Sequence, residues 1–407
     1  MEIETPSGVK TLKLGHNNAE NPFNAAQRFI DQNQLHQSYL GDIVEWITSR
    51  SGQSMPTIGQ DASQQQSSNL PTTTYTPAHT PAVTAKKQFS FETKAFVYYD
   101  DIPASNKLLG KLIEFNELVE SEVKLSQTDI EDLESVMKVI GETSRYHVSI
   151  ISEAQVRCLM RPVLGWTAEY CFPLFDILRI ICIHPVGAEA ISKLRDVGRV
   201  VERALSFLSS ELSHSSSSSS HTPVPAPYPT CLTASRFLCN AMRSDILRSK
   251  IFSTGTLLSS YVSMLDANTS TSTTYLQLNK LIRVSISRIL INFTSPKAII
   301  LLSEAQIQVL LDASQRILAS EKESAEVVFN ALQAIGTIIV SSSSRSLPIA
   351  ATAAVSSSDM KQALQQQLTS SLQYWSSVSL NAGGGGGGGI GDSAMRCLQE
   401  VLDILSS

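Results

Sequence analysis

The chain has 407 residues, of which 42% are hydrophobic and 17% are charged, with a formal net charge of −5. This length allows two or three domains with a packed core. The acidic balance gives no reason to expect nucleic-acid binding, because domains that bind nucleic acid are usually basic. Charged residues such as Glu169 and Arg179 interrupt the most apolar stretch, so no membrane insertion is expected.

The six cysteines form no C-x-x-C motif, and most of them lie within apolar helical patterns. This pattern predicts buried, reduced thiols and an intracellular protein. The first residues have no apolar core of a signal peptide, which agrees with that expectation. We expect the protein in the cytoplasm and the nucleus.

The first 50 residues predict a small, partial α+β module. Residues 3–14 have the pattern of a hairpin with a Pro-Ser-Gly turn. A helix is expected to start at Pro22, and a second, shorter helix covers 37–49. A unit of this size has little core of its own, so we expect it to be part of a larger module.

Residues 51–88 consist largely of Gln, Ser, Thr and Pro, a composition that predicts a disordered linker. Residues 89–407 predict helix after helix with no alternating strands, which makes this domain all-α. Helix starts with the spacing of a capping box, a serine followed three residues later by an acidic or amide residue, recur at Ser126 with Asp129, Ser152 with Gln155 and Ser320 with Glu323. The expected helices are 105–121, 127–140, 153–160, 167–184, 187–208, 230–243, 245–265, 274–293, 297–319, 324–341, 358–376 and 391–405.

Low-complexity inserts separate these helices, including the serine run at 215–220 and seven glycines at 383–389. Helices in series with insertions between them are typical of an α-solenoid, in which each repeat contacts only its neighbours.

Two of the helices carry an Arg–Asn column. Arg236 precedes Asn240 by four residues, and Arg288 precedes Asn292 by four. Residues at this spacing share one helix face. Asn amides can pair with the N–H and C=O of an extended peptide, and Arg guanidinium groups can bind carboxylates.

The charge distribution supports an acidic ligand for these columns. Residues 221–300 contain eight Lys and Arg against two acids, whereas 101–150 contain ten acids against five bases. The expected peptide-binding residues are Arg179, His184, Arg236, Asn240, Arg283, Arg288 and Asn292. For any single arginine, a surface position with an apolar stem is the alternative, and Asp176–Arg179 can also be a local ion pair.

Catalytic motifs are lacking. The sequence contains no G-x-S-x-G, P-loop or H-E-x-x-H pattern, and its seven histidines are scattered. We therefore expect no enzyme activity, no cofactor and no metal site.

Several segments resemble the phospholipase A-2-activating protein family. "NPFNAAQRFIDQNQLHQSYLGDIVEWI" (21–47) resembles the end of its ubiquitin-binding PFU module. "FVYYDDIPASNKLLGKLIEFNE" (96–117) resembles the start of its PUL domain, and "WTAEYCFPLFDILRIICIHP" (166–185) the most recognisable PUL segment. "RFLCNAM" (236–242) and "ISRILINF" (286–293) look like later repeats of that domain.

The resemblance implies an armadillo-like PUL domain over 89–407, a linker over 51–88 and a partial PFU module over 1–50. It further implies an adaptor that binds the acidic C-terminal tail of the AAA ATPase valosin-containing protein, and ubiquitin through the PFU part. Complete family members carry an N-terminal WD-repeat propeller, which we expect to be missing here, together with the first PFU strands.

Two other readings stay open. The helical array can be a scaffold for a different acidic partner, or an activator of a lipase as the family's name suggests. No residue chemistry in the sequence supports the second reading.

Overall fold

The computed structural model describes residues 2–5, 8–11, 14, 22–33, 43–44, 46–47, 89–142, 149–209, 226–270, 277–343, 358–381 and 390–405. The chain divides into two compact units, Met1–Thr84 and Ala85–Ser407. The predicted linker, the serine run and the seven glycines lie outside the described residues.

The first unit contains the predicted hairpin and helix. Strands β1 (Glu2–Thr5) and β2 (Gly8–Thr11) pair antiparallel, with Ile3 opposite Lys10. Helix α1 (Pro22–Asn33) begins at the predicted proline. Its buried face packs with the helical residues near 45 in one small apolar cluster, made of Ala25, Ala26, Phe29, Ile30, Ile43, Val44 and Ile47.

The described part of the second unit is helical apart from its connecting segments. Its elements are α3 (Ser105–Leu118), η2 (Ser121–Val123), α4 (Gln127–Gly141), α5 (Glu153–Arg157), α6 (Met160–Gly165), α7 (Phe172–Ile181), α8 (Pro185–Lys193), α9 (Val197–Ser209), α10 (Tyr228–Arg243), α11 (Asp245–Ser253), α12 (Gly255–Thr269), α14 (Lys280–Thr294), α15 (Pro296–Ile299), α16 (Glu304–Ser320), α17 (Ala325–Ser343), α19 (Ser358–Asn381) and α20 (Ile390–Leu405).

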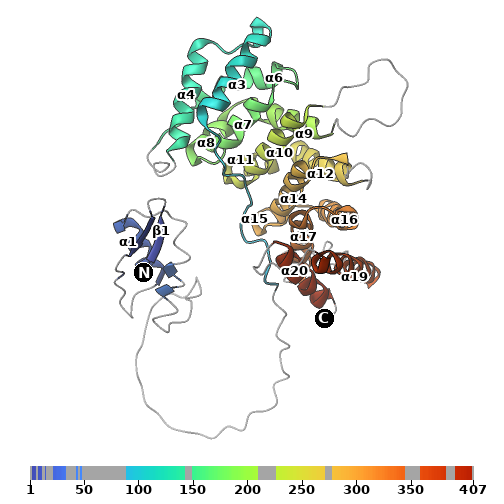
Figure 1. Ribbon diagram of the computed structural model, residues 1–407. Coiled ribbons are helices and arrows are strands. Elements are labelled where there is room, and N and C mark those ends of the chain that lie inside the picture. Colours follow the sequence, from blue (N-terminus) through green and yellow to red (C-terminus); the bar gives the residue numbers. More distant parts are fainter. Residues whose placement is uncertain are drawn as a thin grey trace, which may run out of the picture. The chain divides into compact units, whose positions relative to one another are not determined.

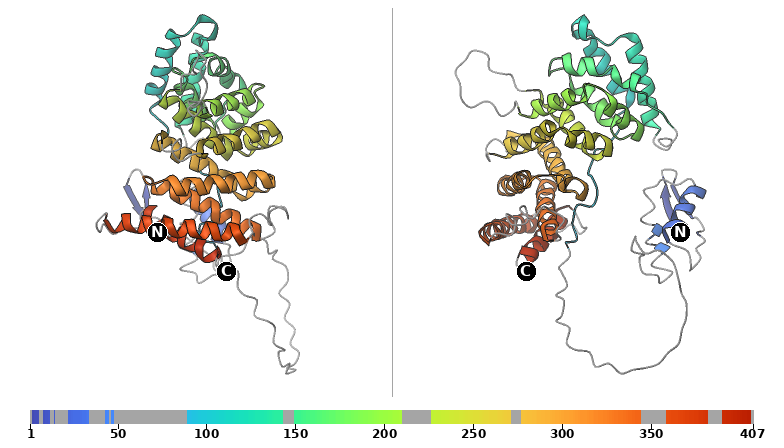
Figure 2. Two further views of the ribbon diagram at one scale, coloured as in Figure 1. Left: turned by 90° about the vertical axis from the view of Figure 1, so that its right-hand side faces the viewer. Right: turned by 180° about the vertical axis from the view of Figure 1, so that it is seen from behind.

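These helices form an armadillo-like solenoid, as predicted. A short helix followed by two longer ones recurs as α8–α9–α10, α11–α12–α14 and α15–α16–α17. Helices α7, α10, α14, α17 and α20 contact one another in that order and form an inner row, while α9, α12, α16 and α19 form an outer row (Figures 1 and 2). Each repeat therefore packs on the next one.

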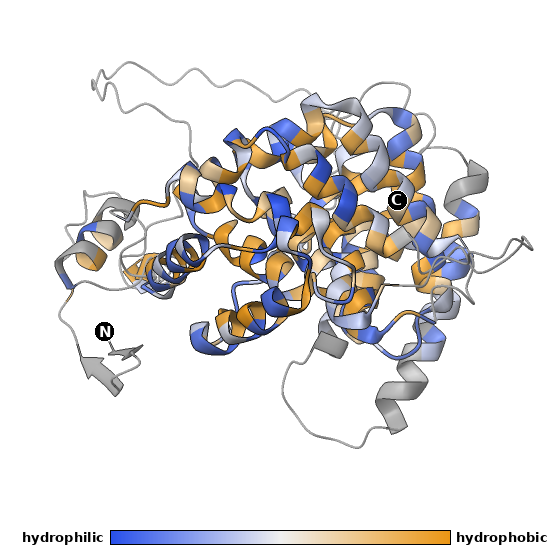
Figure 3. Cartoon of the chain, turned by 90° about the horizontal axis from the view of Figure 1, so that it is seen from above, coloured by the Kyte–Doolittle hydropathy of each residue, from blue (hydrophilic) through white to orange (hydrophobic). Residues whose placement is uncertain are grey.

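One apolar core runs through the whole second unit, from Phe89 to Leu405. Most helices of the solenoid carry both apolar and polar stripes (Figure 3). Such stripes are expected for helices that bury one face against a neighbour and expose the other.

Three helix predictions were wrong because each joined two helices. The predicted helix 187–208 is α8 and α9, the predicted helix 245–265 is α11 and α12, and the predicted helix 297–319 spans α15 and α16. The backbone is extended at Leu194 and at Thr254, where the short helix ends. The apolar pattern continues across both breaks because the short and the long helix are each buried, so periodicity alone does not locate the turn.

Two of the three capping boxes predicted from the sequence are present in the structure. The capping boxes predicted at Ser126 with Asp129 and at Ser152 with Gln155 are both present. The one predicted at Ser320 is wrong, since this serine ends α16. The hydroxyl of Ser324 instead accepts the hydrogen bond from Val327 N at the start of α17.

All six cysteines are free and five of them are buried, as the sequence predicts. Burial raises the pKa of the Cys171 thiol to about 11 and that of Cys239 to about 12, so both stay protonated at neutral pH. Within the described residues, no helix is long and apolar enough to cross a membrane.

His184 is buried and caps helix α8. Its Nδ1 accepts a hydrogen bond from Gly187 N at 3.2 Å, and its Nε2 lies 2.9 Å from Ser149 Oγ. Because Nδ1 is the acceptor, Nε2 carries the ring proton in the neutral tautomer. Burial lowers the pKa of His184 below its usual value of 6.5, which favours this neutral form.

This cap predicts a pH-dependent stability. The unfolded chain binds a proton at His184 near pH 6.5, whereas the folded chain resists it, so the stabilisation is full above that pH and decreases as the pH falls below it. His184→Asn keeps a capping acceptor that does not titrate. We expect urea unfolding between pH 5 and pH 7 to show a shallower pH dependence in this variant. Equal slopes in the two proteins would contradict the assignment.

Candidate functional site

An extended segment precedes α3 and follows the inner row of the solenoid. We call residues 89–101 the strap. It crosses the inner helices in the order opposite to their order in the chain (Figure 1). Its contacts join Ser90 N to Glu400 on α20, Thr93 N to Thr337 on α17, Val97 to Asn292 on α14, Tyr99 to Asn240 on α10 and Asp101 to Arg179 on α7.

Asn240 and Asn292 hold the strap by its backbone. Oδ1 of Asn240 accepts from Tyr99 N at 2.7 Å, and its Nδ2 donates to Tyr99 O at 2.9 Å. Asn292 makes the same pair of bonds with Val97, both at 2.8 Å. The sequence predicts both amides as ligands of an extended peptide, and in the structure that peptide is the chain's own strap. Their role toward a partner stays a prediction.

Arginines cover the aromatic side chains of the strap. The guanidinium groups of Arg236 and Arg288 lie 4.7 and 4.4 Å from the centre of the Tyr99 ring. Arg243 and Arg248 lie in the same way over Tyr98 and Phe96, at 3.9 and 4.1 Å. Such contacts are favourable between a cation and a ring face. Burial raises the pKa of Tyr99 to about 12, so its ring remains neutral.

Arg179 fixes the end of the strap to α7. Only 1% of its side chain is exposed, and its Nε donates to Asp176 at 2.7 Å. Its second nitrogen, Nη1, donates to Tyr99 O and to Asp101 Oδ1, both at 3.2 Å. A buried guanidinium requires such partners to offset its loss of hydration. The predicted ion pair with Asp176 is therefore present, and the side chain is occupied by the fold.

Arg283 and His184 do not lie with the other predicted residues. Arg283 is buried and bonds to Glu321, to Glu323 and to the carbonyl of Leu278. It precedes Arg288 by five residues, which places it about 140° around the helix. His184 caps α8 as described above. Both side chains stabilise the solenoid, and we leave them out of the candidate site as a correction to the sequence prediction.

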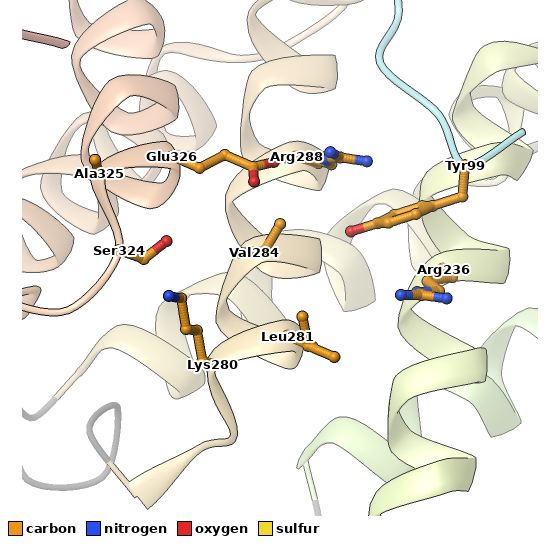
Figure 4. Close-up of a pocket in the computed structure, with 9 residues that line it drawn as sticks. All are labelled: Tyr99, Arg236, Lys280, Leu281, Val284, Arg288, Ser324, Ala325 and Glu326. Carbon is orange, nitrogen blue, oxygen red and sulfur yellow. Dashed lines mark hydrogen bonds and ion pairs between the residues drawn. The ribbon is translucent and has the colours of Figure 1, made fainter. Parts of the chain in front are cut away.

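A pocket of about 360 Å³ opens beside Tyr99, between α10, α14 and α17 (Figure 4). Its lining combines apolar groups with cations and one acid: Tyr99, Arg236, Lys280, Leu281, Val284, Arg288, Ser324, Ala325 and Glu326. Of these residues, Arg236 and Arg288 were predicted from the sequence. Tyr99, Lys280 and Glu326 were not, because only the fold brings them to the same place.

Two of the three cations in the pocket keep unused hydrogen-bonding capacity. Lys280 is exposed and has no ion-pair partner within the described residues. Arg236 lies 3.7 Å from Asp101, and its buried Nε has no hydrogen-bond partner in the described structure. Arg288 differs, because its Nε and Nη2 both donate to Glu326 Oε1, at 3.0 and 2.8 Å.

Helix ends add to the positive potential of the pocket. Lys280 is the first residue of α14, and Ala325 is the first residue of α17. The N-terminus of a helix carries a partial positive charge that favours anions, while its backbone N–H groups are partly capped here, by Asn279 at Leu281 N and by Ser324 at Val327 N. The pocket therefore suits an anionic group that is accompanied by an apolar one.

The comparisons with known proteins agree with this architecture. The PUL domain family matches residues 92–372, which include the strap from Glu92 onward and the solenoid through most of α19. The chain belongs to the PUL domain family. The PFU family, described as "PLAA family ubiquitin binding", matches residues 1–55 of the same chain.

Three similar proteins have low sequence identity to this chain. The ubiquitin homeostasis protein lub1 of Schizosaccharomyces pombe is 26% identical over 211 residues, which cover 49% of this chain and 25% of that protein. The chain thus spans about a quarter of this curated relative. The PFU–PUL domain pair of Saccharomyces cerevisiae Doa1/Ufd3 is 12% identical, with a TM-score of 0.39 and full coverage of both chains. A designed armadillo repeat protein has 14% identity and a TM-score of 0.36, covering 74% of this chain and 100% of its own.

The bonds between Asn292 and the strap predict that Asn292→Ala loosens the strap of this PUL domain. The variant loses both backbone bonds to Val97, and one buried bond of this kind contributes about 1 kcal/mol. We expect amide hydrogen exchange within residues 92–101, measured by mass spectrometry, to become at least tenfold faster.

The matched control is Asn330→Ala. Asn330 is also a buried asparagine on an inner helix, but it donates to Ser287 Oγ and makes no hydrogen bond to the strap within the described residues. The strap should exchange at the wild-type rate in this control. If the exchange rate of the strap amides in Asn292→Ala equals that of wild type, contacts other than the Asn292 bonds hold the strap.

Proposed function

We propose that this PUL domain is a non-enzymatic adaptor that binds the acidic C-terminal tail of the AAA ATPase valosin-containing protein in the pocket beside Tyr99. The observation that carries the proposal is the pair Lys280 and Arg236, whose donors are not used up by the fold. The apolar surfaces of Tyr99, Leu281 and Val284 lie in the same pocket.

The strap restricts how a partner chain can bind. Asn240 and Asn292 already bind Tyr99 and Val97, so an incoming chain has no free asparagine of this pair to bind its backbone. Recognition then depends on side chains and on the terminal carboxylate. A chain end that offers one carboxylate beside an aromatic or aliphatic group meets these requirements, because cations bind the first and the pocket wall covers the second.

The PFU part adds a second activity to the proposal. The match of residues 1–55 to a family described as ubiquitin-binding supports ubiquitin as its ligand. We further propose that the adaptor works in ubiquitin-dependent protein turnover in the cytoplasm and the nucleus. A general helical scaffold for another acidic partner is the alternative, and a protein that captures other acidic chains from a cell extract but not the ATPase would favour it.

Charge reversal in the pocket tests the tail site. Arg236→Glu combined with Lys280→Glu should weaken binding of a synthetic decapeptide with the ATPase tail sequence by at least tenfold in calorimetry. The reason is that two cations facing the carboxylate become anions. Raising the salt concentration should weaken the wild-type complex, since screening reduces attraction between charges.

Lys297→Glu is the control for this experiment. Lys297 is an exposed lysine on α15 that lies outside the pocket, so it tests the effect of charge alone. The affinity of Lys297→Glu for the tail peptide should stay within threefold of the wild-type affinity. Equal affinities of the pocket variant and the control, with both folded by circular dichroism, would remove this pocket from the proposal.

The ubiquitin site can be tested separately. Titration of ¹⁵N-labelled ubiquitin with the full chain should shift ubiquitin resonances, and a chain that lacks residues 1–55 should not. Equal shifts with both chains would place ubiquitin binding outside the PFU part.

A further inference from the structure

Glu326 is the acidic side chain among the nine residues that line the pocket. Its Oε1 accepts hydrogen bonds from two nitrogens of Arg288, and both side chains are about one quarter exposed. A carboxylate is therefore already bound to Arg288, one of the two arginines that face the Tyr99 ring. A pocket that serves only to attract negative charge would have no need for this group.

Glu326 also has two structural roles. It lies in the first turn of α17, where an acid is favourable next to the helix N-terminus. Its bond to Arg288 also holds that guanidinium near the Tyr99 ring. These roles explain why an acid is tolerated there, but they do not remove its effect on a ligand. Like charges at close range repel strongly where the surroundings are partly dehydrated.

We propose that Glu326 sets the charge selectivity of the pocket. By occupying Arg288 it directs the carboxylate of a ligand to Arg236 and Lys280, and it disfavours a ligand that brings a second negative charge to the same place. The pocket then selects a chain end with one anionic group next to an apolar or neutral polar side chain. This inference rests on the proposed function and deepens it, because it states which chain ends the site accepts.

The balance of charges in the site supports this selectivity. The pocket contains three cations and one carboxylate, and Asp101 lies at 3.7 Å from Arg236 on the strap side. A ligand with one carboxylate meets two cations that keep free donors. A second carboxylate would have only Arg288 left, and there it would lie next to the carboxylate of Glu326, to which Nε and Nη2 of Arg288 already donate.

The test compares two synthetic decapeptides with the ATPase tail sequence, both with a free C-terminus. One has its last residue replaced by Asn and the other by Asp, so that they match in shape and differ by one charge. We expect the full wild-type chain to bind the Asn-ended peptide at least fivefold more tightly in calorimetry. In Glu326→Gln this preference should fall below twofold, mainly because the Asp-ended peptide binds more tightly.

Glu323→Gln is the matched control, because it removes the same charge three residues earlier. Glu323 pairs with Arg283 and does not line the pocket. Its preference between the two peptides should equal that of wild type. Thermal melting of all three proteins checks that each is folded.

The possible outcomes separate this inference from the proposed function. If wild type binds and Glu326→Gln keeps the wild-type preference, the selectivity role is wrong and the tail site stands. If wild type binds both peptides with equal affinity, the selectivity role is likewise wrong and the tail site stands. If neither wild type nor Glu326→Gln binds either peptide, the selectivity role and the tail site are both wrong.

Discussion

The site depends on the bidentate hydrogen bonds of Asn240 and Asn292 to the strap. An extended segment that is not part of a sheet must find other partners for its buried backbone N–H and C=O groups. The two amides supply both groups for Tyr99 and for Val97, two residues apart on the same side of the strap. Because these bonds fix the strap, they also fix the Tyr99 ring that forms one wall of the pocket.

The strap changes the kind of recognition that this solenoid can perform. An open row of asparagines is suited to an extended peptide of many residues, bound through its backbone. In this chain the strap takes that place, and its aromatic groups are covered by Arg243 and Arg248. What remains is the pocket at Tyr99, where we propose that a chain end binds. Under this proposal, the same residue types recognise a chain end in place of a peptide backbone.

Features that depend on local sequence could be predicted, and those that depend on distant contacts could not. The boxes at Ser126 and Ser152 and the Arg–Asn columns follow from spacings of three or four residues. The strap was missed because its bonds join residues 141 and 195 positions apart. Lys280 and Glu326 were missed for the same reason, since each belongs to a different helix end. Arg283 was misplaced because its spacing to Arg288 is five and not four.

The basic stretch 221–300 shows why charge counted along the sequence overestimates the charge of a groove. The acids that neutralise its arginines come from other parts of the chain, because Glu321 and Glu323 bind Arg283 and Glu326 binds Arg288. In α7, Arg179 is neutralised by Asp176 of its own helix and by Asp101 of the strap. A guanidinium attracts a ligand only where the fold leaves one of its donors without a partner. Of the four arginines that the sequence singles out, Arg236 alone makes no hydrogen bond within the described structure, and its neighbourhood is therefore where we propose that an anionic chain end binds.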